Sequence, residues 1–285
     1  MKPNLFLIGA PKSGTTALAK YLSSHEYIQS CKYKEPFYFA DEFQSYHKAK
    51  NLKQYLKLFN FKSGVSYYLD ASTHYLMSKS AIKNIYCYNK HAKYIVMLRN
   101  PYDMIISWHY ELLYQGLTCY DLADCIINLE KSYNKYQGDK IIYDYLKVAC
   151  NGIHLKRVLK TVSKENIKFV FFDDLKENTK ETYQNVLDFL EIPESKNVKF
   201  KKINYKKTHG NKFIKKFIIR ISTTLNYLGI KNTGFGKMLL TYNSNKVKNN
   251  NNYFYFSKES RDILNHDINI IENITGKNLS NWKKN

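Results

Sequence analysis

The segment that most constrains the fold of this 285-residue chain is LFLIGAPKSGTTALAKYL, residues 5–22. Its apolar beginning stops at Gly9, then glycines, a lysine and hydroxyl residues follow, and apolar periodicity returns from Ala17 onward. This pattern predicts a strand, a tight loop and a helix. Such a loop directs backbone N–H groups and a helix N-terminus toward an anion, so the segment indicates a phosphate-binding site.

The loop differs from the ATP- and GTP-binding loop at one decisive position. In the pattern G-x-x-x-x-G-K-[ST], Gly9, Gly14 and Thr16 match, but Thr15 replaces the lysine that reaches the β- and γ-phosphates. A lysine is present instead at Lys12, inside the loop. There an ammonium group would lie beside a 5′-phosphate and its bridging oxygen. The alternative is an ordinary strand–loop–helix corner with a solvated lysine.

The remainder of the chain alternates short apolar runs with helical patterns. Strands are predicted at Tyr27–Ile28, up to Asp70, at Tyr94–Leu98 and at Ile167–Phe172. Helical periodicity covers residues 120–160, and an amphipathic helix is predicted for 258–282. Short buried strands between helices are typical of an α/β protein, so we expect a P-loop-like central parallel sheet flanked by helices. We expect one domain over residues 1–285.

The positive charge of the chain is concentrated in one stretch. The formal net charge is +21, and residues 195–258 contain fourteen Lys and one Arg but no Asp or Glu. This basic, loop-rich subregion, at about 195–257, indicates an anionic partner such as a nucleotide, an acidic polymer, a nucleic acid or a membrane surface. Lys206 and Lys207 are candidates to close over a nucleotide. The segment 213–228 is a candidate to bind an anionic acceptor or a membrane surface. A solvated, lysine-rich exterior is the alternative.

The cysteines and the hydropathy bear on compartment. Five cysteines form an odd set without CxxC pairs or zinc-like spacing, so we expect neither a disulfide framework nor a metal site, and a reducing compartment fits best. No apolar run is long enough to span a bilayer, and no signal-like segment opens the chain. We therefore expect a soluble, cytoplasmic protein.

A second motif, LRNPYDMIISWHY, narrows the interpretation of the first loop. With both motifs the chain resembles the sulfotransferases that use 3′-phosphoadenosine 5′-phosphosulfate (PAPS). In that superfamily a KxGTT loop holds the 5′-phosphosulfate, and a later strand ends in Arg, with Ser eight residues on, both of which bind the 3′-phosphate. Open α/β sheets bind ligands at the carboxyl ends of their strands, where this Arg would lie. The resemblance implies a nucleotide site formed by Lys12, Ser13, Gly14, Thr15, Thr16, Arg99 and Ser107.

The chain is most similar to the glycan branch of the superfamily, the heparan sulfate type and its bacterial relatives. KEPFYF matches a loop with Glu before an aromatic pair, and TGKNLSNW matches the C-terminal ending. In YLDASTHYL, Ala71 replaces a family lysine and so removes a cation near the transferring group. The resemblance implies PAPS as donor, 3′-phosphoadenosine 5′-phosphate (PAP) as product and a carbohydrate or glycan acceptor, which can be anionic. It implies neither a metal nor nucleic acid.

Sulfuryl transfer needs an in-line hydroxyl, a proton acceptor and stabilisation of the leaving phosphate. We assign leaving-group stabilisation to Lys12 and the loop N–H groups. Glu35 is the candidate general base, and its aromatic surroundings predict a raised pKa. The alternative for Glu35 is a surface glutamate paired with an adjacent lysine. His74 is the rival base or a contact to the acceptor. Asp70 is expected to orient Lys12 or a substrate hydroxyl, or to cap the next helix with Ser72.

Two other functions compete with sulfuryl transfer. A P-loop kinase of small molecules is disfavoured by Thr15 and by the lack of a clear magnesium-binding acid after a second strand. A non-enzymatic module that binds polyanions or nucleic acid through the basic subregion would show strongly salt-dependent binding and no affinity for nucleotides.

Overall fold

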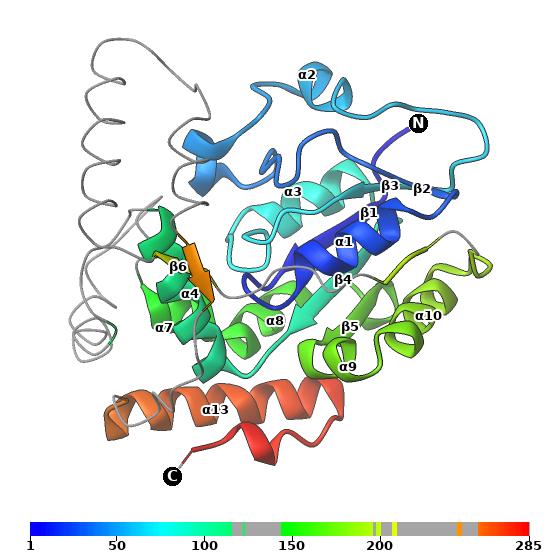
Figure 1. The fold of residues 1–285 in the computed structure, drawn as a ribbon. Helices are drawn as coiled ribbons and strands as arrows, with labels where there is room; N and C mark the ends of the chain where they lie inside the picture. Colours follow the sequence, from blue (N-terminus) through cyan, green and yellow to red (C-terminus); the bar gives the residue numbers. More distant parts are fainter. Residues whose placement is uncertain are drawn as a thin grey trace.

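The computed structural model describes residues 1–115, 122, 144–195, 198–200, 207–209, 244–246 and 256–284. Five strands form the central sheet: β1 (Leu5–Gly9), β2 (Ile28–Ser30), β3 (Tyr67–Asp70), β4 (Lys93–Leu98) and β5 (Ile167–Phe171). Their order across the sheet is β2-β3-β1-β4-β5, and every neighbouring pair is parallel. Parallel neighbours need a crossover connection, and the helices that supply these crossovers surround the sheet (Figure 1).

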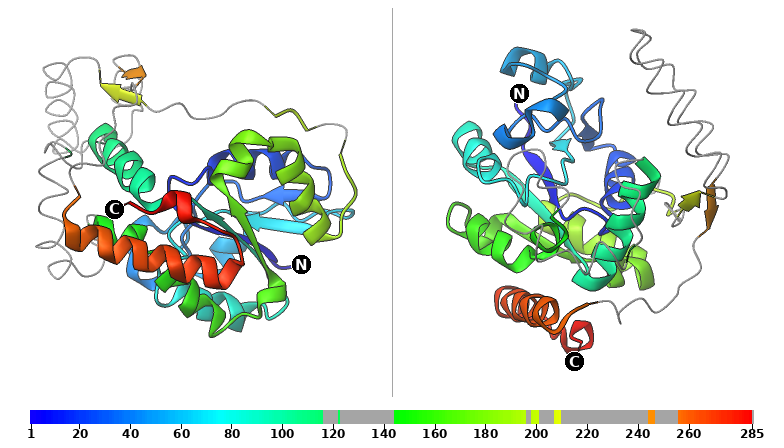
Figure 2. Two further views of the ribbon diagram at one scale, coloured as in Figure 1. Left: turned by 90° about the horizontal axis from the view of Figure 1, so that it is seen from below. Right: turned by 90° about the vertical axis from the view of Figure 1, so that its left-hand side faces the viewer.

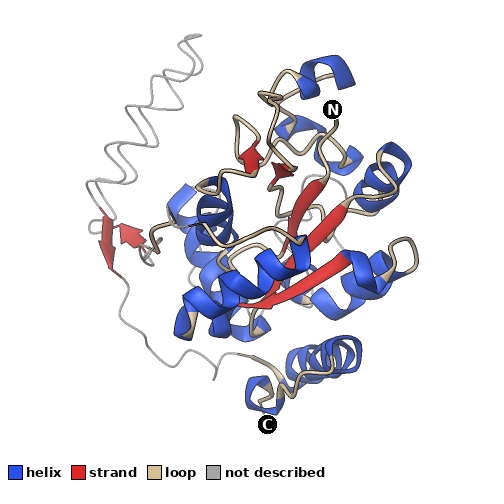
Figure 3. Ribbon diagram, turned by 90° about the vertical axis from the view of Figure 1, so that its right-hand side faces the viewer, coloured by secondary structure: helices blue, strands red, loops and turns tan. Residues whose placement is uncertain are grey.

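The helices lie in two layers, one on each face of the sheet (Figure 3). Alternate residues of a strand point to opposite faces, so each apolar face of the sheet packs against its own layer of helices. Leu5 and Leu7 of β1 pack with α1 (Thr15–Ser23), α9 (Phe172–Glu177) and α10 (Thr179–Leu190). Phe6 and Ile8 belong to the larger core on the other face. That core includes α3 (Ala81–Tyr88), α4 (Pro101–Gln115), α7 (Tyr145–Ala149), α8 (Asn151–Leu159) and α13 (Lys258–Thr275).

Short elements complete the described structure. The 3₁₀ helix η1 (Asp41–Tyr46) and α2 (Leu52–Leu56) lie between β2 and β3 in the chain, and η3 (Lys164–Asn166) precedes β5. A small antiparallel pair, β6 (Lys207–His209) with β7 (Ser244–Lys246), lies apart from the central sheet and beside α4 (Figure 2).

The C-terminal segment runs across the molecule on α8 (Figure 1). Asp267 of α13 is fully buried, and its carboxylate accepts the N–H groups of Gly152 and Ile153 at 2.8 and 2.9 Å, in the first turn of α8. A continuous helix to residue 282 was predicted, and this is wrong. Helix α13 ends at Thr275, because Gly276 adopts a left-handed conformation (φ 75°) and a 3₁₀ turn, η5 (Ser280–Trp282), follows.

The predicted α/β class and central parallel sheet are confirmed, and each predicted strand is present within a residue or two of its expected limits. Helical periodicity over 120–160 is confirmed for α7 and α8, and most of the rest of that interval lies outside the described residues. The basic subregion at 195–257 also lies largely outside them, including Lys206. For Lys207, only its place in β6 is described.

Candidate active site

Four neighbouring strands end at the same edge of the sheet. β3 ends at Asp70, β1 at Gly9, β4 at Leu98 and β5 at Phe171. The residues that follow these ends in the chain carry nearly all of the predicted site, because the carboxyl ends of parallel strands form the ligand-binding edge of an open α/β sheet. The segment after β3 is bound to the end of β1 directly, since the N–H of Leu76 donates to the carbonyl of Ile8 at 2.7 Å.

The loop between β1 and α1 forms an anion cradle. Gly14 caps α1 in a left-handed conformation (φ 88°), and its carbonyl accepts the N–H groups of Ala17 and Leu18. Among the described residues, the N–H groups of Gly14, Thr15 and Thr16 have no protein acceptor. They lie at the positive end of a nine-residue helix, which favours an anion there.

Gly14 is required by space as well as by its backbone conformation. A Cβ atom at this position would lie 3.0 Å from the ring of Phe172 and 3.2 Å from the methyl group of Met97. The floor of the cradle is therefore formed by β4 and by the residue that follows β5. Lys12 also has a left-handed backbone (φ 61°), which a non-glycine residue rarely adopts.

Arg99 joins the cradle to the start of α4. Its Nη1 donates to the carbonyl of Lys12 at 2.8 Å, and its guanidinium carbon lies 4.5 Å from the centre of the Phe172 ring. The arginine is thus held between the loop backbone and an aromatic face. Ser107 lies two turns into α4, is 8% exposed, and its hydroxyl group makes no hydrogen bond to another described residue. Both predicted ligands of the 3′-phosphate therefore belong to the β4–α4 unit.

Lys12 has a partner that the sequence did not indicate. Its Nζ lies 2.7 Å from Oε2 of Glu111, which is on α4 one turn after Ser107. Gln115 donates to the other oxygen of the same carboxylate at 2.8 Å. Burial raises the pKa of Glu111, but Lys12 and these hydrogen bonds outweigh it, so the pKa lies below its usual value. The alternative of a solvated lysine is therefore wrong, because the ammonium group of Lys12 is paired with Glu111.

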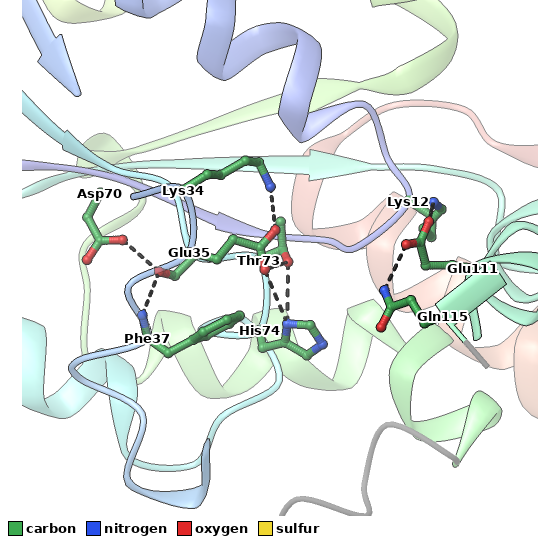
Figure 4. A network of polar contacts seen from close by, with 10 residues as sticks. Lys12, Lys34, Glu35, Phe37, Asp70, Thr73, His74, Glu111 and Gln115 are labelled. Carbon is green, nitrogen blue, oxygen red and sulfur yellow. Dashed lines mark hydrogen bonds and ion pairs between the residues drawn. The ribbon is translucent and has the colours of Figure 1, made fainter. Parts of the chain in front are cut away.

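Glu35 lies on a loop that faces the segment after β3. Its backbone is left-handed (φ 62°), and its N–H donates to the carbonyl of Ala71 at 3.1 Å. One carboxylate oxygen pairs with Lys34, and the other accepts the hydroxyl of Thr73 at 3.1 Å. Nδ1 of His74 lies 3.8 Å from the same oxygen (Figure 4). The two candidate bases are therefore neighbours.

The predicted raised pKa of Glu35 is wrong. Burial does raise it, but the proximity of His74 and the charge and hydrogen bond of Lys34 outweigh burial and lower the pKa to about 2. The aromatic wall is present, yet the polar side chains close to the carboxylate decide the direction of the pKa shift. Glu35 is thus ionised at neutral pH and accepts protons weakly in the free protein. The alternative of a glutamate paired with an adjacent lysine is correct in one respect, since Lys34 does pair with Glu35.

His74 lies inside an aromatic cluster. Its ring centre is 5.3 Å from that of Phe37, 5.2 Å from that of Phe43 and 5.7 Å from that of Trp108. Trp108 follows Ser107 on α4, so the His74 ring lies between the segment that carries Phe37 and helix α4. Nε2 of His74 is buried without a hydrogen-bond partner among the described residues.

Asp70 has none of its three predicted roles. It does not contact Lys12, and its side chain is fully buried, out of reach of a substrate hydroxyl. Its carboxylate accepts hydrogen bonds from the hydroxyl groups of Tyr55, Ser72 and Tyr75. Residues after it form turns, so it caps no helix. Sequence reasoning misplaced it because the two tyrosines that surround it lie 15 residues before and five residues after it in the chain.

The C-terminal TGKNLSNW segment contacts the residues that follow β4 and β5. Trp282 donates from Nε1 to Asp173 at 3.1 Å, and its carbonyl accepts the side-chain amide of Asn100 at 3.3 Å. Lys277 pairs with Asp174 at 2.5 Å. These contacts hold the residues on either side of the Arg99–Phe172 stack.

Among the described residues, no group of His, Cys, Asp or Glu side chains is arranged to hold a metal ion. Within the same part of the chain, no helix combines the length and apolarity that crossing a bilayer requires.

Comparison with known proteins gives one consistent family. A model described as "Sulfotransferase domain" matches residues 2–235. The bifunctional heparan sulfate N-deacetylase/N-sulfotransferase 1 of Caenorhabditis briggsae is 25% identical over 199 residues, which cover 67% of this chain and 23% of that protein. The membrane-associated sulfotransferase kil1 of Dictyostelium discoideum is 33% identical over 115 residues, which cover 39% of this chain and 23% of that protein. The chain thus matches about a quarter of the length of these relatives.

One solved structure shares the fold over its whole length. A sulfotransferase from Alicyclobacillus acidocaldarius superposes with a TM-score of 0.73 at 18% identity and covers 100% of both chains.

Proposed function

The chain belongs to the sulfotransferase family, and from this membership we propose that it moves a sulfuryl group from PAPS to a hydroxyl of a carbohydrate or glycan acceptor. The observation that carries the proposal is one edge of the sheet that combines an anion cradle around Lys12 and Arg99 with the ionised carboxylate of Glu35. The heparan sulfate N-sulfotransferases among the relatives support a glycan acceptor.

The cradle suits a nucleotide with a 5′-phosphosulfate and a separate 3′-phosphate. The three free N–H groups at the start of α1 and the ammonium group of Lys12 would take the phosphosulfate. Arg99 and Ser107 would take the 3′-phosphate. A nucleotide without β- and γ-phosphates needs neither a lysine at position 15 nor magnesium, which accounts for the unusual loop.

In the proposed reaction, the acceptor oxygen forms a bond to sulfur while the bond between sulfur and the bridging oxygen of the phosphosulfate breaks. The acceptor loses a proton, and PAP leaves with the negative charge that Lys12 and the loop N–H groups stabilise. Glu35 is the proposed proton acceptor. Its low pKa in the free protein depends on Lys34 and His74, so movement of either side chain away from the carboxylate would raise it. Nε2 of His74 is the proposed contact to the acceptor hydroxyl.

The first test is nucleotide binding without magnesium. We expect PAP to raise the melting temperature more than ADP does, because only PAP carries the 3′-phosphate that Arg99 and Ser107 would bind. A ligand at 100 times its Kd adds about 2.7 kcal/mol to the free energy of unfolding, which a thermal-shift measurement detects. Equal shifts for PAP and ADP would remove the 3′-phosphate assignment, and ATP binding that requires magnesium would favour the kinase.

The second test is transfer itself. We expect radiolabelled sulfate from PAPS to appear in a panel of glycans that includes heparan sulfate precursors, and no label to appear with ATP-derived phosphate. If the protein binds PAPS but labels no carbohydrate, the proposed carbohydrate acceptor is wrong and the proposed donor stands.

A further inference from the structure

We propose that Asp70 is a positioning residue that fixes the backbone of the loop carrying Glu35, acting through the hydroxyl groups of Ser72 and Tyr75. We define the Glu35 loop as residues 34–39. The inference rests on the proposed function only in giving Glu35 a chemical role, because the network that holds the loop is independent of that role.

Asp70 is the centre of a buried polar network. It ends β3, its side chain is fully buried, and three hydroxyl groups donate to its carboxylate. The hydroxyls of Tyr55 and Tyr75 lie 2.8 and 3.0 Å from Oδ2, and that of Ser72 lies 2.7 Å from Oδ1. Burial of a carboxylate costs free energy unless the group is hydrogen-bonded, and here three hydroxyl groups supply those hydrogen bonds.

Two of the three hydroxyls make a second contact, and both of these contacts are to the Glu35 loop. Oγ of Ser72 accepts the backbone N–H of Phe37 at 3.2 Å, and the hydroxyl oxygen of Tyr75 accepts that of Phe39 at 3.3 Å. Figure 4 shows Asp70 and Phe37 linked through the shared hydroxyl between them. The loop backbone is therefore connected to Asp70 at two alternate residues.

The third hydroxyl belongs to a side chain that packs on the same loop. The ring of Tyr55 stacks on that of Tyr38, with centres 4.6 Å apart and planes 13° apart, and makes an edge contact with Phe39 at 5.2 Å. Tyr55 thus joins the carboxylate to the aromatic side chains of the loop. All three partners of Asp70 contact the loop, through its backbone or its rings.

The backbone N–H groups and the carboxylate together decide the direction of these hydrogen bonds. Burial raises the pKa of Asp70 to about 6 and the charge of Glu35 adds to this effect, whereas the hydroxyl bonds oppose it. The backbone N–H groups of Phe37 and Phe39 can only donate, so the hydroxyl oxygens of Ser72 and Tyr75 accept there. The protons of Ser72 and Tyr75 must then point to Asp70, which leaves their oxygen lone pairs for the N–H groups of Phe37 and Phe39.

The Glu35 loop needs such support because its backbone is strained. Glu35 and Phe37 both have left-handed backbones, with φ of 62° and 55°, and neither is glycine. Such conformations persist where surrounding contacts hold them, and they are frequent at functional sites. Without the two N–H bonds, the loop would relax toward ordinary backbone angles and carry the Glu35 carboxylate away from Thr73 and His74.

Asp70→Asn tests the inference, because an amide of the same shape turns one acceptor into a donor facing the hydroxyls. Ser72→Ala is the second variant, since it removes the acceptor for Phe37 while keeping the carboxylate, and Ser72→Thr restores a hydroxyl. The matched control is Asp267→Asn, which alters another fully buried aspartate, one that accepts two backbone N–H groups in α8. The readouts are kcat, the Kd for PAP and amide hydrogen exchange at Phe37 and Phe39.

We expect Asp70→Asn and Ser72→Ala to lower kcat at least tenfold, to leave the Kd for PAP within twofold, and to speed exchange at Phe37. Ser72→Thr should recover most of the rate, and Asp267→Asn should lose stability but keep kcat and the exchange at Phe37. Unchanged kcat and exchange in Asp70→Asn and Ser72→Ala would overturn the inference while the proposed function stands. If the wild-type protein transfers no sulfuryl group but exchange still rises in both variants, the proposed function fails and the positioning role stands.

Discussion

The anion cradle and the Glu35 loop lie on the same edge of the sheet but are built in different ways. The free N–H groups of the cradle belong to one continuous segment, Gly9 to Thr16, although Arg99, Met97 and Phe172 contact that segment from other parts of the chain. The Glu35 loop is held by Asp70, Ser72 and Tyr75, which follow more than thirty residues later. A local motif therefore forms one half of the site, and long-range side-chain contacts form the other.

This difference extends to charge. Lys12 and Arg99 bring positive charge to the cradle, whereas the carboxylate of Glu35 lies between Lys34 and His74. The two halves are close enough to interact, because the charge of Glu35 weakly opposes the lowering of the Glu111 pKa that Lys12 causes. We therefore expect substitutions in the two halves to separate binding from rate.

The largest effect is expected for Glu35→Gln. The amide keeps the shape of the side chain but removes the proton acceptor, so kcat should fall by roughly 100-fold to 10,000-fold, with little change in the Kd for PAP. Steady-state kinetics and titration calorimetry measure the two quantities. Glu42→Gln is the control, because Glu42 accepts the N–H groups of Lys79 and Ser80 and has a structural role. Should His74→Ala abolish transfer while Glu35→Gln stays near normal, His74 is the base.

The next effect is expected for Lys12→Ala. Loss of one preorganised cation at the leaving group should lower kcat by about 100-fold to 1,000-fold, with the fold intact by circular dichroism. Unlike Glu35→Gln, this variant should also weaken PAP binding, since Lys12 would contact the product phosphate. Lys20→Ala, an exposed position on α1, is the control for loss of positive charge. Turnover close to wild type in Lys12→Ala would mean that the loop N–H groups are sufficient.

The fold was largely predictable because its strands are short, apolar and bounded by turn residues. The residues Gly9–Thr16 correctly predicted the turn from β1 into α1, and Asn100-Pro101 correctly predicted the start of α4. The sequence analysis missed the end of α13, although Gly276 is a typical C-terminal signal, because it extended the amphipathic pattern to Trp282. Its tryptophan instead turns back onto Asp173 and Asn100.

The site was predictable only where its geometry is local. Arg99 and Ser107 share one strand–helix unit, so their spacing was informative. The pKa of Glu35 and the role of Asp70 depend on how separate segments pack, and no periodicity in the sequence reports that packing. Glu111 was missed for the same reason. It is four residues after Ser107 and so on the same face of α4, a signal that could have placed it near the cradle.

A smaller effect is expected for Ser107→Ala, which tests the nucleotide half alone. A hydrogen bond to a charged phosphate contributes about 1.5–3 kcal/mol, so the affinity for PAP should fall at least tenfold. ADP has no 3′-phosphate, and its affinity should not change. Calorimetric titration of both nucleotides into wild type and variant measures the difference. Equal losses for PAP and ADP would place Ser107 elsewhere in the nucleotide site.

The smallest effect is expected for Glu111→Gln, and its sign is informative. Glu111 neutralises Lys12 across 2.7 Å, and both side chains are partly exposed, so the pair contributes about 0.2–1 kcal/mol. Gln keeps the shape but not the charge, which frees Lys12 and removes a negative charge near an anionic ligand. The affinity for PAP should therefore rise about twofold to fivefold, more at low salt than at high salt.

The matched control for this last prediction is Glu272→Gln. Its carboxylate pairs with Lys283 at 2.6 Å with similar exposure, on the C-terminal segment and not in the cradle. We expect this variant to leave the affinity for PAP unchanged. If Glu111→Gln instead weakens binding, Glu111 orients Lys12 toward the phosphate and does not compete with it. In that case side-chain contacts from α4 shape the cradle, and the contrast between a backbone-built half and a side-chain-built half would no longer hold.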